Sequence, residues 1–577
     1  MENISLKKFI PAIIAVICLI VLWSICPICF QNNDDKVIMY LTAGYTTGMP
    51  ELGTVFGGFL WSGLIGIFYR IYSGIAWYTV LSLVVIALSL IVIFYSICKS
   101  VESSHIILQI APCFVLFIGV LMYFMAALQY TVTAAIVGCG AVCALVTYLY
   151  TDIRRRWLVI SIVLLVCSFS IRKQIGWVSF SAALIVGFLA LVKAAIDRKK
   201  IKADDENNST DSLSLRQIII AAAAIIIAFA IVYVSNAIYE KASGIADFNE
   251  YYAEAGDWID YPHLDIADDT EGVYESVGWD QELYDIASRW YFMDERLTTE
   301  NFAVINSGYS ADSLTVKEYI KRSIDLMQSS PICNVQLAAW IVILVAINGY
   351  AIINRQFNIM LCAADSLFVF CMLILAYFCI LQGRFPMRVY EALLIIYMIP
   401  SVLMLFIADN SDDRHKYNII FIMLGCLFIA GSFITFPSGN MLKATYAKCH
   451  DADRTQEIAE AEALESYAIA NSDNIYVYDY ELSLPSDAFT TYTDGVPSNV
   501  LFWGGWTYNT PMYYSQLAAN GRDGIYAEDF IDGNIYLCGR YVDDTMTAYM
   551  QSLFPDAEPV VVDEFDGIVV YQYTIRN

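Results

Sequence analysis

Histidine is scarce in this chain, with four residues among 577, and the four positions are scattered along it. None of them has the spacing of metal-ligating histidines. The chain also has no glycine-rich phosphate loop, no GxSxG elbow and no HExxH motif. These absences leave zinc hydrolysis, serine hydrolysis and ATP-driven transport without support in the sequence.

Charged side chains are few as well, since 16% of the residues are Asp, Glu, Lys or Arg whereas 58% are hydrophobic. A soluble protein of this length does not contain so much apolar sequence. Apolar runs recur, each long enough to cross a hydrocarbon core of roughly 30 Å as a helix. We therefore predict a membrane-spanning α-helical bundle with about eleven spans. The predicted spans are 9–30, 75–98, 105–128, 132–150, 157–171, 175–194, 217–236, 333–353, 357–380, 386–407 and 418–437.

Two polar segments interrupt and follow these spans. Residues 237–332 contain 6 basic and 20 acidic side chains, and residues 438–577 contain 6 and 22. Surfaces this acidic exclude nucleic acid as a partner. We predict a transmembrane module over 1–236 with its first outer loop at 31–74, an aromatic-rich helical segment over 237–332, a second transmembrane module over 333–437 and an α/β domain over 438–577.

The orientation follows from Lys and Arg near the span ends, because these residues are retained in the cytoplasm. If the spans alternate, 15 basic residues lie on one side and six on the other. This predicts a multi-pass plasma-membrane protein with a cytoplasmic N-terminus and an extracytoplasmic C-terminus. The apolar stretch 50–73 would reverse the charge pattern as a span, so we expect outer-face helices lying on the membrane there. The six outer basic residues are Lys36, Arg70, Arg172, Lys173, Arg384 and Arg388.

In the C-terminal segment, "NIYVYDY", "NIYLCGRYV", "PVVVDEF" and "GIVVYQY" have the composition of strands. The stretch "DDTMTAYMQSLF" predicts a helix between two of them, and "TQEIAEAEALESYAIANSDN" predicts a helix that ends near Asn471. Cys449 and Cys538 are the two cysteines of this segment. Spacing alone does not decide between a disulfide and two free thiols.

Asp34 and Asp35 directly follow the first span, at the predicted outer face. A carboxylate that water can reach beside an apolar surface can act as a general base and activate a hydroxyl group. The alternative is structural, because Asp is favoured at the start of a helix such as "DKVIMYLTAGY". Two adjacent acids also leave a divalent cation open as a cofactor, although no further ligands accompany them.

Arg172 and Lys173 lie between two short apolar runs, on the side where the positive-inside rule disfavours cations. Charges placed in this way commonly line a functional cavity. Arg offers a bidentate fork and Lys a point charge, and both suit a phosphate or pyrophosphate group. A short hairpin whose cations reach towards the membrane surface is the alternative.

Arg384 and Arg388 are four residues apart in "GRFPMRVYE", where Pro386 suits a helix start. Both guanidinium groups can therefore face one outer pocket and bind phosphate. An ion pair between Arg388 and Glu391 on the helix surface is the structural alternative. Asp365 lies inside a predicted span, where it is either part of a transport pathway or a hydrogen-bond partner of a neighbouring helix.

The whole arrangement resembles GT-C superfamily glycosyltransferases. The features that carry the resemblance are the acidic pair after the first span, the outer-face cations and the C-terminal α/β domain. The stretches "AGYTTGMPELGTVF", "GIAWYTVLS", "GRFPMRV" and "GGWTYNTPMY" are similar to an uncharacterised membrane family of this kind that is often found in Gram-positive bacteria. Members of the superfamily take a sugar from a polyprenyl-phosphate or diphosphate carrier.

The resemblance implies roles for individual residues. The first-loop acid of the family corresponds to Asp34 or Asp35, and the carrier-binding cations correspond to Arg172 and Lys173, with Arg384 and Arg388 beside them. Glu51 stands where comparable sequences have an acid after the "TGxP" step. Those sequences also have a histidine there, which this chain lacks. The implied function is transfer of a sugar to a cell-surface glycan or lipid acceptor.

Three other functions remain open at this point. A glycan ligase or polymerase would use two lipid-linked substrates and related chemistry. A transporter or flippase of lipid-linked sugars would depend on Asp365, and an assembly protein would use its acidic segments to bind partners.

Overall fold

The structure is a computed structural model. It describes residues 9–101, 105–203, 215–309, 315–328, 330–354, 359–407, 411–434, 441–450, 452–478, 487–492 and 495–575. The predicted spans 357–380 and 418–437 lie partly outside the described residues.

The chain is mostly helical, in agreement with its composition. The helices up to the first polar segment are α1 (Ile10–Ile25), α2 (Asn33–Ala43), α3 (Phe59–Ile71), α4 (Trp77–Val101), α5 (Ile106–Leu116), η2 (Phe117–Leu121), α6 (Met122–Phe124), α7 (Tyr130–Tyr150), α8 (Arg155–Ile171), α9 (Lys173–Ala203) and α10 (Leu215–Ser243). Those that follow are α11 (Ile245–Asp260), η3 (Ile266–Asp268), α12 (Val273–Ser276), α13 (Gln281–Ala287), α14 (Thr299–Gly308), α15 (Val316–Gln328), α16 (Pro331–Ile353), α17 (Ile359–Leu381), α18 (Met387–Leu405) and α19 (Ser411–Ile434).

Nine helices in the described part of the chain are long and apolar enough to cross a membrane. The chain is therefore a multi-pass membrane protein, as predicted. Two of the expected spans, 9–30 and 157–171, correspond to the shorter helices α1 and α8, which have 16 and 17 residues. The number of eleven spans and their orientation remain predictions.

Helix α7 lies at the centre of the bundle, in contact with α4, α8, α9 and α18. All of its residues are buried except Tyr150, which is partly exposed. Its sequence is rich in Gly, Ala, Cys and Thr, and small residues let membrane helices approach closely. A Cβ atom at Gly138 would collide with Ser179 of α9, so this crossing requires glycine. The first residue of α7 consequently has a fixed position, which matters for the site described below.

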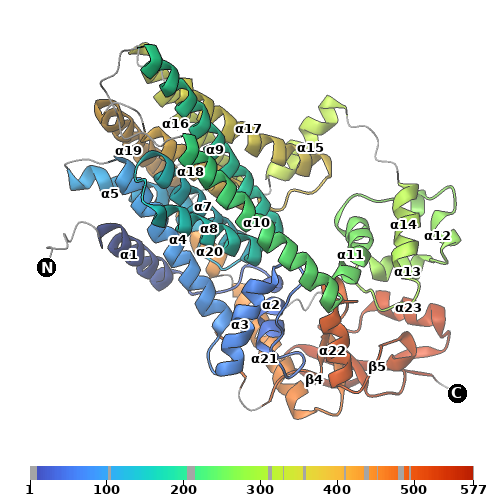
Figure 1. Ribbon diagram of the computed structural model, residues 1–577. Coiled ribbons are helices and arrows are strands. Elements are labelled where there is room, and N and C mark those ends of the chain that lie inside the picture. Colours follow the sequence, from blue (N-terminus) through green and yellow to red (C-terminus); the bar gives the residue numbers. More distant parts are fainter. Residues whose placement is uncertain are drawn as a thin grey trace.

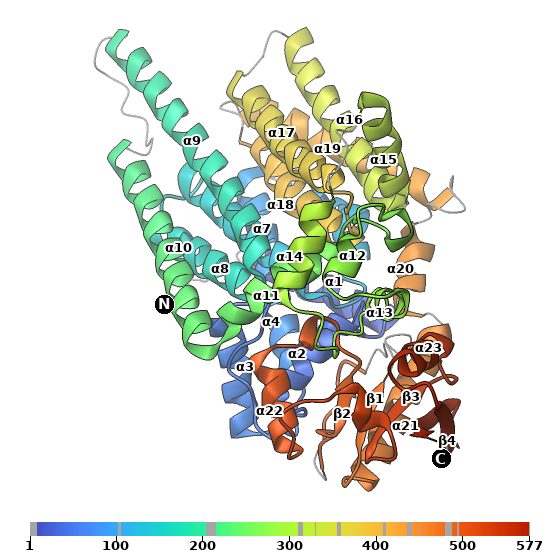
Figure 2. The ribbon, with the colours of Figure 1, turned by 90° about the vertical axis from the view of Figure 1, so that its right-hand side faces the viewer.

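Most of the two polar segments gathers at one end of the bundle, whereas α15 packs against α16 and α17. Figure 1 shows α2, α3, α11–α14 and the sheet at this end, with the N-terminus at the other side of the molecule. In Figure 2 the sheet lies at the lower end and α9 projects from the upper end. Trp258 and Phe302 of the first polar segment share one hydrophobic core with Leu501 and Leu537 of the C-terminal segment. The two acidic segments are therefore packed together.

The C-terminal segment forms a five-stranded sheet in the order β2-β1-β3-β5-β4. Strands β2, β1 and β3 are parallel, whereas β5 and β4 are antiparallel to their neighbours. The elements are α20 (Met441–Cys449), α21 (Ala452–Ala470), β1 (Ile475–Tyr478), β2 (Val500–Phe502), η5 (Gly505–Thr507), α22 (Pro511–Ala519), η6 (Ala527–Phe530), β3 (Ile535–Gly539), α23 (Asp544–Leu553), β4 (Ala557–Phe565) and β5 (Ile568–Ile575). The predicted small C-terminal sheet is confirmed, and β2 is an additional strand. Cys449 and Cys538 are both free thiols.

Helix α3 falls in the stretch expected to lie on the membrane. Its exposed apolar side chains Leu60, Leu64, Ile67 and Ile71 follow one another at helical spacing. Its opposite face packs against α2, α4 and α8. One side of the helix is thus apolar and uncovered, while the other holds the first loop against the bundle.

Candidate functional site

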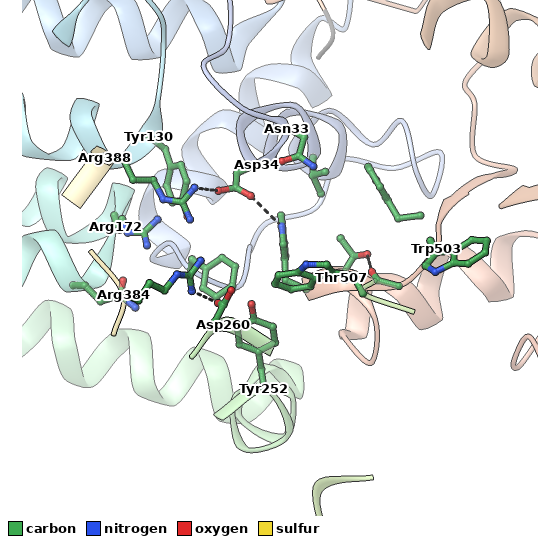
Figure 3. Close-up of a pocket in the computed structure, with 18 of the residues that line it drawn as sticks. Asn33, Asp34, Tyr130, Arg172, Tyr252, Asp260, Arg384, Arg388, Trp503 and Thr507 are labelled. Atoms are coloured by element: carbon green, nitrogen blue, oxygen red, sulfur yellow. Dashed lines mark hydrogen bonds and ion pairs between the residues drawn. The ribbon is translucent and has the colours of Figure 1, made fainter. Parts of the chain in front are cut away.

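A cavity of about 380 Å³ lies where the bundle meets the polar segments. Its walls come from the first turn of α2, the start of α7, the turn between α8 and α9, the end of α11, the start of α18 and residues 502–507. Figure 3 shows three arginines on one side of this cavity and Trp503 and Thr507 on the other. Segments far apart in sequence therefore form one site.

Asp34 faces this cavity from the first turn of α2. Its Oδ2 atom lies 3.1 Å from a guanidinium nitrogen of Arg388 and accepts a hydrogen bond of 3.0 Å from Asn32 Nδ2. Its Oδ1 atom accepts a hydrogen bond of 3.2 Å from Trp506 Nε1. The partial positive charge of the helix N-terminus also favours a carboxylate here. All of these contacts hold the carboxylate in one orientation towards the cavity.

Asp35 points the other way, although it is the next residue. Its side chain is 2% exposed and accepts hydrogen bonds from the Tyr78 hydroxyl at 2.7 Å and from the Tyr130 backbone N–H at 3.3 Å. Burial raises the pKa of Asp35 to about 7, and the hydrogen bond from Tyr78 opposes part of that rise. Because Tyr130 begins α7, Asp35 connects the first loop to the central helix.

Arg172 lies at the C-terminal end of α8, with its guanidinium group 4.6 Å from the centre of the Tyr130 ring. One of its terminal nitrogens is buried and has no hydrogen-bond partner. The Nε atom of Arg388 is also buried without a partner. Buried donors without acceptors are unfavourable, and an anion in the cavity would satisfy them.

Arg384 binds Asp260, the last residue of α11. Burial raises the pKa of Asp260, and the neighbouring Arg384 opposes this rise. The side chain of Asp260 belongs to the same cavity as Asp34. Asp260 is one of 20 acids in residues 237–332, so nothing in the sequence singled it out.

Lys173 and Glu51 are not among the described residues that line this cavity. Lys173 instead forms an ion pair with Glu240 of α10. Glu51 lies in the first loop, where burial raises the pKa of its carboxyl group. The cavity thus brings together Arg172, Arg384 and Arg388 but not these two residues.

Glu391 does not form the ion pair with Arg388 that was considered as the structural alternative. It is fully buried and binds Lys448 at 3.1 Å. Arg388 therefore remains available to Asp34 and the cavity.

An aromatic wall, formed by Phe56, Tyr252, Trp290, Trp503 and Trp506, completes the cavity. Trp290 has a left-handed backbone with φ +67°, and its carbonyl oxygen accepts a hydrogen bond of 2.8 Å from Gly505 N–H. Such strained backbone is common at binding sites. Trp506 of this wall belongs to the "GGWTYNTPMY" stretch, whose composition alone did not reveal its position.

Asp365 accepts hydrogen bonds from Asn348 Nδ2 at 3.0 Å and Ser401 Oγ at 3.1 Å. It thus joins α17 to α16 and α18, which is the structural alternative considered for it. Asp365 is not among the described residues that line the cavity.

A search for grouped metal ligands gave a negative result for the described residues. No three His, Cys, Asp or Glu side chains among them lie in an arrangement that could hold a metal ion. The side chains of Asp34 and Asp35 face different neighbours, so the two adjacent acids do not form a joint set of ligands.

No protein-family model matches the chain, and no curated protein matches it. Two solved structures are similar to it. They are described as ArnT from Cupriavidus metallidurans bound to undecaprenyl phosphate and the same protein in the apo state. They are 11% and 10% identical to the chain, each with a TM-score of 0.36 and with 97% of both chains covered. At this level of similarity, the chemistry has to be argued from the residues of this chain.

Proposed function

We propose that the protein is an integral membrane glycosyltransferase of the GT-C type. It transfers a sugar from a polyprenyl-phosphate or polyprenyl-diphosphate donor to an extracytoplasmic glycan or lipid acceptor. One observation carries this proposal: Asp34 faces the same cavity as three arginines, two of which have buried nitrogens without partners. The site therefore combines a base with an anion-binding surface beside the membrane bundle.

The chemistry follows from these groups. A hydroxyl oxygen of the acceptor attacks the anomeric carbon of the donor sugar, and its proton passes to the Asp34 carboxylate. The bond between the anomeric carbon and the phosphate oxygen breaks, and the oxygen keeps the electron pair. Arg172, Arg384 and Arg388 stabilise the negative charge that develops on the phosphate.

The surrounding residues position these groups. Asp35 connects α2 to the start of α7, where the Tyr130 ring supports Arg172. The aromatic wall offers ring faces on which a sugar can stack. Because Trp503 and Trp506 of this wall come from the C-terminal segment, that segment belongs to the catalytic unit in this proposal.

The decisive experiment incubates purified protein with a panel of polyprenyl-phosphate and polyprenyl-diphosphate sugars and with acceptor glycans. Mass spectrometry then measures the released carrier and the modified acceptor. We expect transfer by the wild-type protein and a loss of about a hundredfold or more in Asp34→Asn, because a general base contributes roughly 10² to 10⁴ in rate.

Asp365→Asn is the matched control, since it removes one carboxylate outside the cavity. A glycosyltransferase keeps its transfer activity in this variant. Loss of lipid-linked sugar transport in Asp365→Asn, with no transfer by the wild-type protein, would instead support the transporter alternative.

A further inference from the structure

The cavity contains an acid that the transfer step does not use. Asp260 forms an ion pair with Arg384, yet a phosphate-binding site gains affinity from an unpaired arginine. A carboxylate beside the leaving phosphate also repels it. Its presence at this position therefore needs a reason of its own.

The formal charge of the cavity supplies that reason. Among the described residues that line it, Arg172, Arg384 and Arg388 are positive, whereas Asp34 and Asp260 are negative. With Asp34 ionised, as it is before transfer and again once it has passed the acceptor proton to water, the sum is 3 − 2, a charge of +1. An anion with a single negative charge balances this lining, whereas a dianion exceeds it.

The proposed reaction makes the phosphate of the lipid more negative, by up to one charge. A sugar linked to its carrier through one phosphate is a phosphodiester with one negative charge. Breakage of the bond to the anomeric carbon leaves a phosphomonoester, which carries about −1.5 to −2 at pH 7. Substrate and product share the same lipid chain and differ in the sugar and in the charge on the phosphate, and the charge is the difference that ionised side chains at the phosphate can read.

We propose that Asp260 is a specificity-determining residue, which sets the cavity charge so that the phosphodiester donor is retained and the phosphomonoester carrier is released. This inference rests on the proposed function. The position of Asp260 supports it, since α11 brings the carboxylate to Arg384, while Arg388 binds Asp34. Each of these two arginines thus already has a carboxylate partner, whereas Arg172 has none in the cavity lining, and buried nitrogens of Arg172 and Arg388 still lack an acceptor.

The test uses two short lipids that differ only in charge, farnesyl phosphate and farnesyl methyl phosphate. Isothermal titration calorimetry in one detergent at pH 7.5 gives the affinity of each for the wild-type protein and for Asp260→Asn. Removal of one negative charge favours a dianion about twice as much as a monoanion. We expect the ratio of the two affinities to shift by about tenfold in favour of farnesyl phosphate.

Two variants control for structural effects. Asp260→Glu retains the charge and keeps the wild-type ratio. Asp257→Asn removes one charge from an exposed position on the same helix, outside the cavity lining, and leaves the ratio unchanged. Each variant is first checked for a monodisperse profile and an unchanged melting temperature, and Asp260→Ser replaces Asp260→Asn if the latter does not fold.

The outcomes separate the two proposals. An unchanged ratio in Asp260→Asn, or an equal gain for both lipids, overturns the role of Asp260 and leaves the proposed function standing. Failure of both lipids to bind the wild-type protein overturns this inference, and the proposed function falls with it if the panel of phosphate- and diphosphate-linked sugars also shows no transfer.

Discussion

Trp506 donates a hydrogen bond through Nε1 to Oδ1 of Asp34 over 3.2 Å, across 472 positions of sequence. The C-terminal segment thereby completes the surroundings of the proposed base. A hydrogen bond to a charged group contributes roughly 1.5–3 kcal/mol, and here it also fixes the direction of the carboxylate.

We therefore expect Trp506→Phe, which keeps an aromatic ring but removes the N–H group, to lower the rate of sugar transfer by about tenfold or more. Transfer kinetics with a saturating lipid donor measure this effect. Trp503→Phe is the comparison, since Trp503 Nε1 is buried without a hydrogen-bond partner. An equal loss in both variants would show that ring packing matters rather than the hydrogen bond.

Asp35 makes the stability of the protein depend on pH. Its folded pKa of about 7 lies above the ordinary value of 3.8, because burial disfavours the charged form. From roughly pH 4 to pH 7 the folded protein holds a proton that the unfolded chain has released. The free energy of unfolding therefore falls as pH rises through this window.

Melting temperatures at pH 5, 6, 7 and 8 test this dependence. We expect the wild-type protein to lose stability towards pH 8 and Asp35→Asn to show a smaller loss over the same range. The difference between the two curves isolates Asp35 from other titrating groups. Parallel curves would contradict the buried position of this carboxylate.

Lys36 and Glu465 form a buried ion pair of 3.0 Å between α2 and α21, with side chains 2% and 6% exposed. The Tyr40 hydroxyl also donates to Glu465, at 2.9 Å. The pair holds the first loop against the C-terminal segment, and removal of one partner leaves a buried charge without compensation. We expect Glu465→Gln or Lys36→Met to lower the free energy of unfolding by about 3 kcal/mol.

The double variant Lys36→Met with Glu465→Gln should lose less than the sum of the single variants, because neither charge is then left alone. Unfolding in mixed micelles measures these differences. Lys241→Met, at an exposed position of α10, is the control and should change little. Additive losses would show that the two side chains do not act as a pair.

The general architecture could be predicted because it depends on local patterns. Apolar runs of membrane-spanning length indicate α4, α7 and α16 directly, and short runs rich in β-branched and aromatic residues indicate β4 and β5. Strand β2 was not predicted, since three residues are too short to show a period. It is defined by pairing with β1, which sequence alone does not reveal.

The cavity could be predicted in part for a similar reason. Arg172, Arg384 and Arg388 stood out because cations are unusual on the outer side of a membrane. Nothing local distinguishes Asp34 from Asp35, whose side chains separate only because helix α2 directs successive residues to different neighbours. Asp260 and Trp506 reach the cavity through tertiary packing. Lys173 does not line the cavity and forms an ion pair with Glu240 instead.

Gly504 determines where Trp506 lies, and its substitution gives the last prediction. Its backbone has φ +149°, which L-residues rarely adopt, and a Cβ atom would lie 2.6 Å from Trp290 O and 2.8 Å from Phe292 N. Residue 504 also pairs with Tyr291 in an isolated antiparallel bridge. Gly504→Ala must therefore push the segment 504–507 away from Trp290, and Trp506 with it.

We expect Gly504→Ala to lower both the melting temperature and the affinity for farnesyl methyl phosphate. Gly521→Ala is the matched control, because Gly521 also has a positive φ, +72°, but has nothing within 4 Å of an added Cβ. It should lose about 1 kcal/mol of stability from the backbone conformation alone and bind the lipid normally. Normal binding in Gly504→Ala would mean that the contact between the C-terminal segment and Asp34 is not needed to form the anion site.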